Sequence, residues 1–269
     1  MVTRHQIGMA GRWLAAGAGL AATSYAGYVG ITWYRYGRVT RHVDAEDRDA
    51  LLDRFMPTYE VAERHHVRIA APAEITFAAA AEMHLEQSSM VRAIFKAREW
   101  IMRSHPAREP EPRAFLSQMR AIGWGVLAEI PGREIVMGAM TQPWMADVVF
   151  RPLPPEEFVA FHEPDYVKIA WTLRADPLGA ADSIFRTETR VITTDPAARA
   201  KFRRYWAFAS PGILLIRWAL LGPLKAEAER RIRGAGGSPT AEATPRHSLS
   251  LWTNSEGTSA RADAIISTR

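Results

Sequence analysis

The 269-residue sequence contains no cysteine, which excludes disulfide bonds, thiolate catalysis and zinc sites of the cysteine type. It also lacks a long basic run: the net charge is +5 and the Lys and Arg residues are spread along the chain, so nucleic-acid binding is not indicated. No Gly-x-Ser-x-Gly elbow, Walker A loop or His-Glu-x-x-His pair occurs, and His84, His105 and His162 have no ligand spacing. We therefore expect no metal site and no cofactor.

The composition is sufficient for a folded core. Hydrophobic residues make up 48% of the chain and aromatic residues 10%, which allows one ordinary domain to fold without metals or disulfides. The absence of cysteine fits a cytosolic and an extracytoplasmic location equally well.

The N-terminal segment has the pattern of a membrane-spanning helix. Residues 13 to 34 carry no charge and are bounded by Arg12 and Arg35. As a helix this run is about 33 Å long, against a hydrocarbon core of about 30 Å. Trp13 and Trp33 stand where interfacial aromatic residues are expected. The pattern predicts an uncleaved single-pass anchor in the cell membrane.

The small residues of this segment suggest one alternative to the anchor and one further property. A secretory signal cleaved after Ala22 or Ala26 is the alternative to the anchor. Four small residues also share one helical face, which would let two membrane helices approach closely and self-associate. They are Ala18, Ala22, Ala26 and Gly30.

The distribution of basic residues predicts the orientation. Arg4 and Arg12 precede the span, and a larger group follows it, consisting of Arg35, Arg38, Arg41 and Arg48. Because the side richer in Lys and Arg stays in the cytoplasm, we expect the globular domain to be cytoplasmic.

Composition and charge divide the chain into four segments. Residues 1–36 are the predicted transmembrane anchor, and 37–58 are a charged juxtamembrane spacer that would stand the domain off the membrane. Residues 59–233 form the globular domain. Residues 234–269 are rich in Gly, Ser, Thr, Ala and Pro and are expected to be a disordered tail.

Periodicity predicts a mixed domain that begins with a strand and ends with a long helix. Strands are expected at 59–69, 124–130, 134–141, 147–151, 166–174 and 183–192, and helices at 71–83, 88–102 and 155–161. Asp195-Pro196 is a strong start for the last helix, which Ser210-Pro211 should kink or restart. Its apolar residues recur every three or four positions, so one stripe of the helix should face the sheet.

Three short stretches within residues 59 to 233 resemble a known group: His66 to Ala73, Thr187 to Val191 and Phe202 to Trp206. They are similar to bacterial polyketide cyclase/dehydrase-like proteins of the START/Bet v 1-like (SRPBCC) superfamily, in an uncharacterised membrane-anchored subgroup. The resemblance implies an α+β helix-grip fold. In that fold a curved antiparallel sheet of about six to seven strands wraps the long C-terminal helix and encloses a cavity. Superfamily members include lipid carriers, small-molecule binders, cyclases and chaperone cofactors, so the fold does not choose a function.

Polar residues on a strand face that should be apolar are the first candidates for a site. Glu63 and His65 lie two apart on the inner face of the first strand, where a carboxylate and an imidazole could bind a ligand hydroxyl or move a proton. The alternative is a structural pair near the end of the strand.

The last strand has two distinct faces. Arg186, Glu188 and Arg190 share one face, which we expect to be a solvated outer surface, and Thr187 and Thr189 share the other, which should line the pocket.

Two tryptophans complete the candidate ligand-binding set. Trp171 and Trp206 are expected to meet where the sheet faces the helix, either as core or as ligand contacts. The preferred function is membrane-anchored binding of a lipid or other hydrophobic small molecule. The alternatives are a cyclase-like enzyme that uses Glu63, His65 or Arg190, and an interaction or envelope module with a vestigial cavity.

Overall fold

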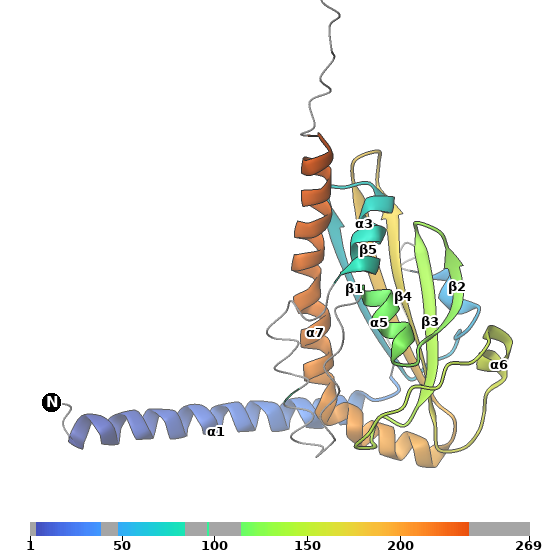
Figure 1. Ribbon diagram of the computed structural model, residues 1–269. Helices are drawn as coiled ribbons and strands as arrows, with labels where there is room; N and C mark the ends of the chain where they lie inside the picture. The colour runs from blue at the N-terminus through green and yellow to red at the C-terminus, as the bar shows by residue number, and fades with distance from the viewer. Residues whose placement is uncertain (1–3, 39–47, 84–95, 97–113, 237–269) are drawn as a thin grey trace, which may run out of the picture.

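The computed structural model describes residues 4–38, 48–83, 96 and 114–236 (Figure 1). Two helices precede the first strand, two short helices follow it, and the other four strands form two pairs separated by a short helix before the long last helix. The elements are α1 Arg4–Arg35, α2 Ala50–Asp53, β1 Val61–Ile69, α3 Ala73–Glu82, α5 Phe115–Ala121, β2 Gly125–Ile130, β3 Glu134–Thr141, α6 Pro155–Ala160, β4 Val167–Pro177, β5 Ser183–Thr193 and α7 Pro196–Gly236.

The strands form one open antiparallel sheet in the order β1-β5-β4-β3-β2, so the first and last strands in the chain are neighbours. Helix α7 lies along one face of this sheet, next to β1 and α3 (Figure 1). This α+β arrangement fits the predicted helix-grip fold. The sheet has five strands among the described residues, however, and not the six to seven that the resemblance implied.

The predicted strand at 147–151 is wrong and accounts for one missing strand. Only Arg151 pairs, through an isolated bridge to Met140 in which each backbone N–H donates to the other residue's carbonyl, at 2.8 and 3.0 Å. Pro152 and Pro154 follow directly and have no N–H group to extend a ladder.

The predicted hairpin at 124–141 is confirmed. β2 and β3 pair antiparallel on either side of a tight turn, where Arg133 N donates to the Ile130 carbonyl at 3.0 Å. Gly132 in this turn has φ of 69°, in the left-handed region that glycine enters without steric cost.

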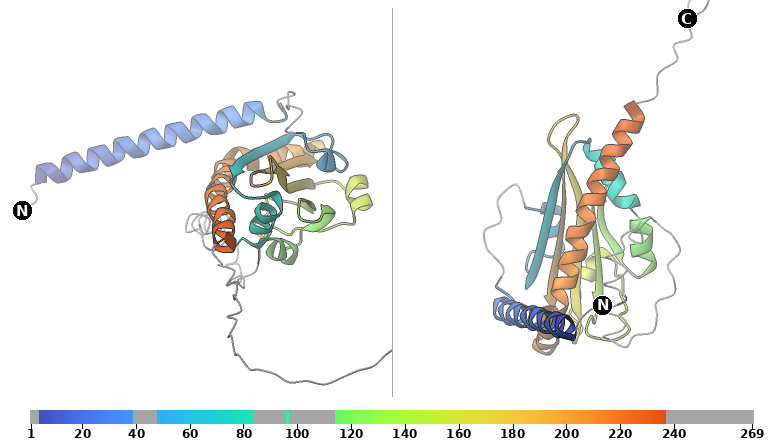
Figure 2. Two further views of the ribbon diagram at one scale, coloured as in Figure 1. Left: turned by 90° about the horizontal axis from the view of Figure 1, so that it is seen from above. Right: turned by 90° about the vertical axis from the view of Figure 1, so that its left-hand side faces the viewer.

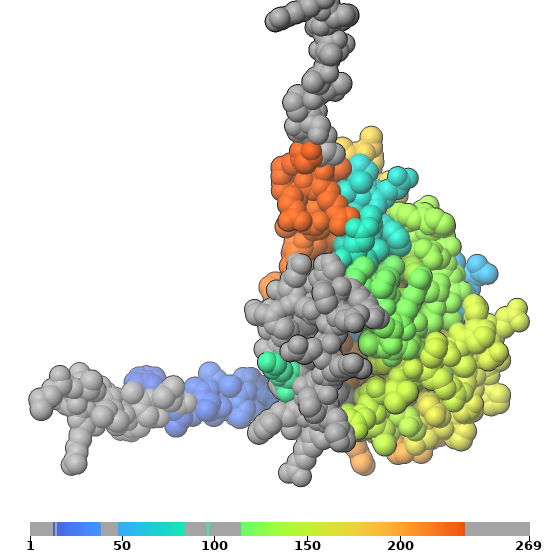
Figure 3. All heavy atoms as spheres, in the orientation of Figure 1, coloured from blue at the N-terminus to red at the C-terminus, as the bar shows by residue number. Residues whose placement is uncertain are grey.

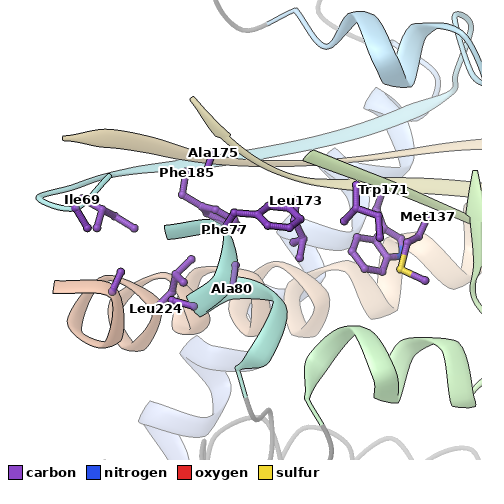
Figure 4. Close-up of a cluster of buried hydrophobic side chains, with 13 residues drawn as sticks. Ile69, Phe77, Ala80, Met137, Trp171, Leu173, Ala175, Phe185 and Leu224 are labelled. Carbon is purple, nitrogen blue, oxygen red and sulfur yellow. The ribbon is translucent and has the colours of Figure 1, made fainter. Parts of the chain in front are cut away.

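The main core lies between the inner face of the sheet and the helices α3 and α7. Figure 4 shows Phe77 of α3 and Leu224 of α7 pointing at the sheet residues Leu173 and Phe185. All four are buried, which is the pattern expected where a sheet packs on helices. Strand alternation places the odd-numbered residues of β1, β4 and β5 on this inner face.

The described part of the predicted spacer packs on the outer face of the sheet. Leu52, Phe55 and Met56 are buried in a second core with Val136 of β3. Asp49 caps α2 by accepting from Leu52 N at 2.8 Å. Residues 48–58 therefore belong to the folded unit instead of standing it off the membrane, because their apolar side chains cover the sheet.

Helix α7 starts where the sequence predicts. Asp195 accepts hydrogen bonds from Ala197 N and Ala198 N, at 2.7 and 3.0 Å. The first part of α7 runs beneath the sheet and the rest turns upward beside it (Figure 1). Pro211 lies inside the helix, where it removes a backbone donor and bends the axis. The helix continues to Gly236; the remainder of the predicted tail, and most of the predicted helix at 88–102, lie outside the described residues.

The predicted anchor segment is a helix, α1, which projects from the folded part (Figure 3). Among the described residues, the helix segment long and apolar enough to cross a membrane by length and composition is Pro196–Gly234. Phe202 and Leu224 of that segment are buried, but most of its apolar stretch is exposed. Helix α1, in which Ala, Gly and Tyr dilute the apolar run, does not meet the same criterion.

Candidate functional site

Four of the six predicted ligand-binding residues meet on the inner face of the sheet. The pairing of β1 with β5 places Glu63 opposite Thr189 and His65 opposite Thr187. All four side chains are partly buried. The two strands thus bring a carboxyl, an imidazole and two hydroxyl groups together beneath α7.

Arg217 of α7 completes this group and was not among the predicted site residues. Its Nη2 donates to Thr189 Oγ1. Its Nη1 and the Nε2 of His65 are buried and have no hydrogen-bond partner among the described residues. Buried polar atoms of this kind are rare and call for a partner. The sequence did carry a signal, because Arg217 is the only charged residue between Gly212 and Leu224.

The titration of the group reflects its burial. Burial raises the pKa of Glu63, and the positive charges of Arg217 and Arg64 oppose this only in part. Burial, together with the charges of Arg217 and His66, lowers the pKa of His65. Burial lowers the pKa of Arg217 to about 10, so the guanidinium remains a cation at neutral pH. The site therefore offers a neutral imidazole and a cationic donor side by side.

A groove of about 410 Å³ lies next to Glu63, at the edge of this group. It lies where the end of α1, the edge strand β1 and the first part of α7 meet, and Glu63 is part of its wall. The lining residues are Tyr28, Ile31, Thr32, Arg35, Tyr36, Gly37, Arg38, Glu60, Val61, Ala62, Glu63, Arg64 and Trp206. The walls combine apolar and aromatic surface with several charged groups, as small-molecule sites do.

The two predicted tryptophans both lie at the helix-facing side of the sheet but do not meet. Trp206 packs with Phe202, their ring centroids 5.9 Å apart, and lines the groove. Trp171 belongs to a different core cluster, where it contacts Trp124 with centroids 5.7 Å apart. The sequence predicted correctly that both tryptophans lie where the sheet faces the helices. It did not predict that they lie at different positions along the strands, because the position of Trp206 depends on where α7 bends.

The predicted solvated surface on the last strand is wrong for two of its three residues. Glu188 and Arg190 are buried beneath α2 and the segment that follows it. Arg190 donates to Glu188 at 2.7 Å, to Asp53 at 2.5 Å and to the Met56 carbonyl at 2.8 Å, so the charges satisfy one another. Since Arg190 faces away from Glu63, it is not a partner for chemistry at the inner face.

Residues suited to hold a metal do not gather in the described part of the chain: no group of three or more His, Asp or Glu side chains has the required arrangement. The polar group at the inner face contains one carboxyl, one imidazole and one guanidinium, besides two threonine hydroxyls. This set is suited to hydrogen bonding with an oxygen-containing ligand.

No protein-family model matches the chain. No curated protein matches it either. Solved structures that match part of this chain include the Zhui aromatase/cyclase from Streptomyces sp. R1128, with 17% identity, 66% of this chain and 99% of that chain covered, and a TM-score of 0.24. CalU16 from Micromonospora echinospora has 12% identity, coverage of 66% and 88%, and a TM-score of 0.22.

The di-domain ARO/CYC BexL from the BE-7585A biosynthetic pathway has 13% identity, coverage of 66% of this chain and 48% of that chain, and a TM-score of 0.23. The identities and TM-scores are all low. The helix-grip assignment therefore rests on the strand order and on the placement of α7 along the sheet.

Replacing Arg217 with methionine is expected to raise the pKa of both His65 and Glu63, because the charge of Arg217 lowers each of them. NMR titration of the two side chains in the full chain in detergent measures this directly. Lys225→Met is the matched control, since Lys225 is an exposed cation on the same helix that pairs with Glu229 at 3.7 Å. Unchanged pKa values in Arg217→Met would place Arg217 away from the group.

Proposed function

We propose that the protein binds a lipid or other hydrophobic small molecule at the membrane, with the apolar part of the ligand in the groove and its oxygen-containing end at Arg217 and His65. The observation that carries the proposal is a pair of buried polar atoms without a partner among the described residues, Arg217 Nη1 and His65 Nε2. They belong to the same inner-face group as Glu63, which is in the wall of a groove of about 410 Å³. A ligand oxygen would complete both hydrogen-bonding groups.

The position of the groove supports a ligand that reaches it from the membrane. Tyr28, Ile31 and Thr32 in its wall belong to α1, the predicted anchor. Glu63 in the same wall adjoins the polar group. An amphipathic molecule lying along β1 would therefore meet apolar surface first and hydrogen-bond donors next.

A long-chain fatty acid with a fluorescent reporter tests the proposal. We expect Arg217→Met to weaken its binding to the full chain in detergent by about tenfold, because a charge-assisted hydrogen bond to the carboxylate contributes about 1.5 kcal/mol. Lys225→Met should bind as the unchanged chain does. Equal affinity of both variants, with Arg217→Met still folded by circular dichroism, would contradict the placement of the polar end.

A cyclase-like enzyme is the second candidate, which the titration of the site favours. Glu63, whose pKa burial raises, and His65, whose pKa burial lowers, lie two apart on one strand face, where a carboxyl and an imidazole could act as acid and base. Aromatase/cyclase is also the class printed for two of the similar structures. Cyclisation of a poly-β-ketone substrate that is lost in Glu63→Gln would establish it, whereas binding without turnover favours the first proposal.

Membrane attachment through α1, with the domain in the cytoplasm, is part of the proposal. Tyr25 and Tyr28 hydrogen-bond to α7, which holds the end of α1 against the folded part. Both tyrosines follow Ala22, so a signal cleaved after Ala22 stays the alternative, as does one cleaved after Ala26. Protease added to intact spheroplasts shows on which side of the membrane the domain lies, because a C-terminal tag is digested only if the domain is outside. Self-association through Ala18, Ala22, Ala26 and Gly30 stays a prediction.

A further inference from the structure

The end of α1 is held against α7, and this restricts how α1 can enter a bilayer. The Tyr25 hydroxyl donates to the Phe208 carbonyl at 2.7 Å, and the Tyr28 hydroxyl and Ser210 Oγ are 2.9 Å apart. Further along, Arg203 Nε donates to the Trp33 carbonyl at 2.9 Å. Residues 25 to 33 therefore run beside the bend of α7.

The free part of α1 is too short to span on its own. From Trp13 to Ser24 the uncharged helix is about 18 Å long, whereas the hydrocarbon core is about 30 Å thick. The whole uncharged run, which extends to Tyr34, is long enough. If it lies in the membrane, the segment of α7 that adjoins residues 25 to 33 must lie at the same depth.

Within that segment, residues 203 to 210, and in the two turns that follow Pro211, α7 exposes large apolar side chains. Phe208 is 60% exposed, Leu215 is 42% exposed and Trp218 is 66% exposed. We call these three residues the α7 apolar face. Two exposed cations, Lys225 and Arg230, follow Trp218 about two and three turns later. Apolar and aromatic residues followed by basic ones are typical of a helix that lies in the headgroup region.

The arrangement of the two helices agrees with this placement. Viewed along α1 from its N-terminal side, α1 is almost end-on and the later part of α7 runs across the sheet (Figure 2, right). In Figure 1 the same part of α7 forms the side of the domain from which α1 projects. A bilayer crossed by α1 would thus meet α7 lengthwise.

We propose that the α7 apolar face is a second membrane contact, which lies in the interface of the bilayer that α1 enters and sets the depth of the domain. The proposal rests on the membrane attachment included in the proposed function but not on ligand binding. It places the mouth of the groove at the lipid headgroups, because the groove is bounded by the same stretch of α1 and by Trp206. A ligand could then pass between bilayer and groove without crossing water.

Nitroxide labels measure the depth, and the absence of native cysteine makes each introduced cysteine unique. The full chain is reconstituted in vesicles of phosphatidylcholine and phosphatidylglycerol with a label at Leu215→Cys or Trp218→Cys. A label at Leu20→Cys reports insertion of the anchor, because the Leu20 side chain of α1 is 71% exposed. A label at Glu129→Cys, at an exposed position of β2, is the control for a site in water. Collisions with oxygen and with a water-soluble nickel complex give the depth of each label.

We expect the labels at 215 and 218 to be more accessible to oxygen and less accessible to nickel than the label at 129. The label at 20 should lie deeper still. Nickel accessibility at 215 and 218 equal to that at 129, while the label at 20 is in lipid, would overturn the second contact and leave the anchor intact. A label at 218 shielded from both reagents would mean that protein covers this face, which also overturns the proposal. A label at 20 in water would overturn the membrane attachment and this proposal together.

Discussion

Replacing Arg190 with alanine is expected to lower the free energy of unfolding by about 3 to 5 kcal/mol, because it breaks a buried ion-pair network. The buried Glu188 would keep only Arg64, the other arginine that pairs with it at 2.7 Å. Arg190 is 2% exposed and Glu188 is 5% exposed. The guanidinium also binds Asp53 and the Met56 carbonyl, so the change releases the segment that covers the outer face of the sheet. Urea unfolding of the full chain in detergent measures the loss.

Arg68→Ala is the matched control for Arg190→Ala. Arg68 is also an arginine on a strand of this sheet, and it forms an ion pair with Asp182 at 3.6 Å, but its side chain is 69% exposed. Exposed pairs of this kind contribute about 0 to 1 kcal/mol, so the midpoint of unfolding should barely move. Equal effects of the two substitutions would show that the outer network is not buried in solution.

Replacing Trp206 with alanine is expected to lower the free energy of unfolding by about 3 to 5 kcal/mol, the usual cost of deleting a large core aromatic side chain. Trp206 is 8% exposed and packs with Phe202 and Val61, where the first part of α7 meets the sheet. Thermal unfolding of the full chain followed by circular dichroism gives the measurement.

Trp218→Ala is the matched control for Trp206→Ala, because it removes the same type of side chain from an exposed position. Trp218 lies on the same helix but is 66% exposed, so its removal in detergent should cost less than about 0.5 kcal/mol. A small effect of Trp206→Ala would mean that the helical phase of α7, and with it the wall of the groove, is misplaced.

The inner-face site could be predicted to the extent that strand alternation determines it. Glu63 and His65 had to share a face, and the antiparallel pairing of the first and last strands placed Thr187 and Thr189 opposite them. Arg217 was not predicted as a site residue, because helical spacing alone does not show whether a single charged residue on a mostly apolar helix points at the sheet or at solvent.

The outer face could not be predicted from the last strand alone. Charged residues at alternate positions, as at Glu188 and Arg190, are ordinarily solvated, and only the position of Asp53 and Met56 from a distant segment makes their burial favourable. The available signal was the apolar group of Leu52, Phe55 and Met56 within a segment that otherwise looked like a charged spacer. Weighing those three residues would have moved the start of the domain towards residue 48.

The most direct test of ligand binding is mass spectrometry of an organic extract of the purified full chain, compared with an extract of Arg217→Met prepared in the same detergent. The account predicts a hydrophobic molecule with an oxygen-containing polar end that co-purifies with the unchanged chain and is depleted from Arg217→Met. If neither extract contains such a molecule and none binds when added, the groove and the polar group beneath α7 do not form a ligand site.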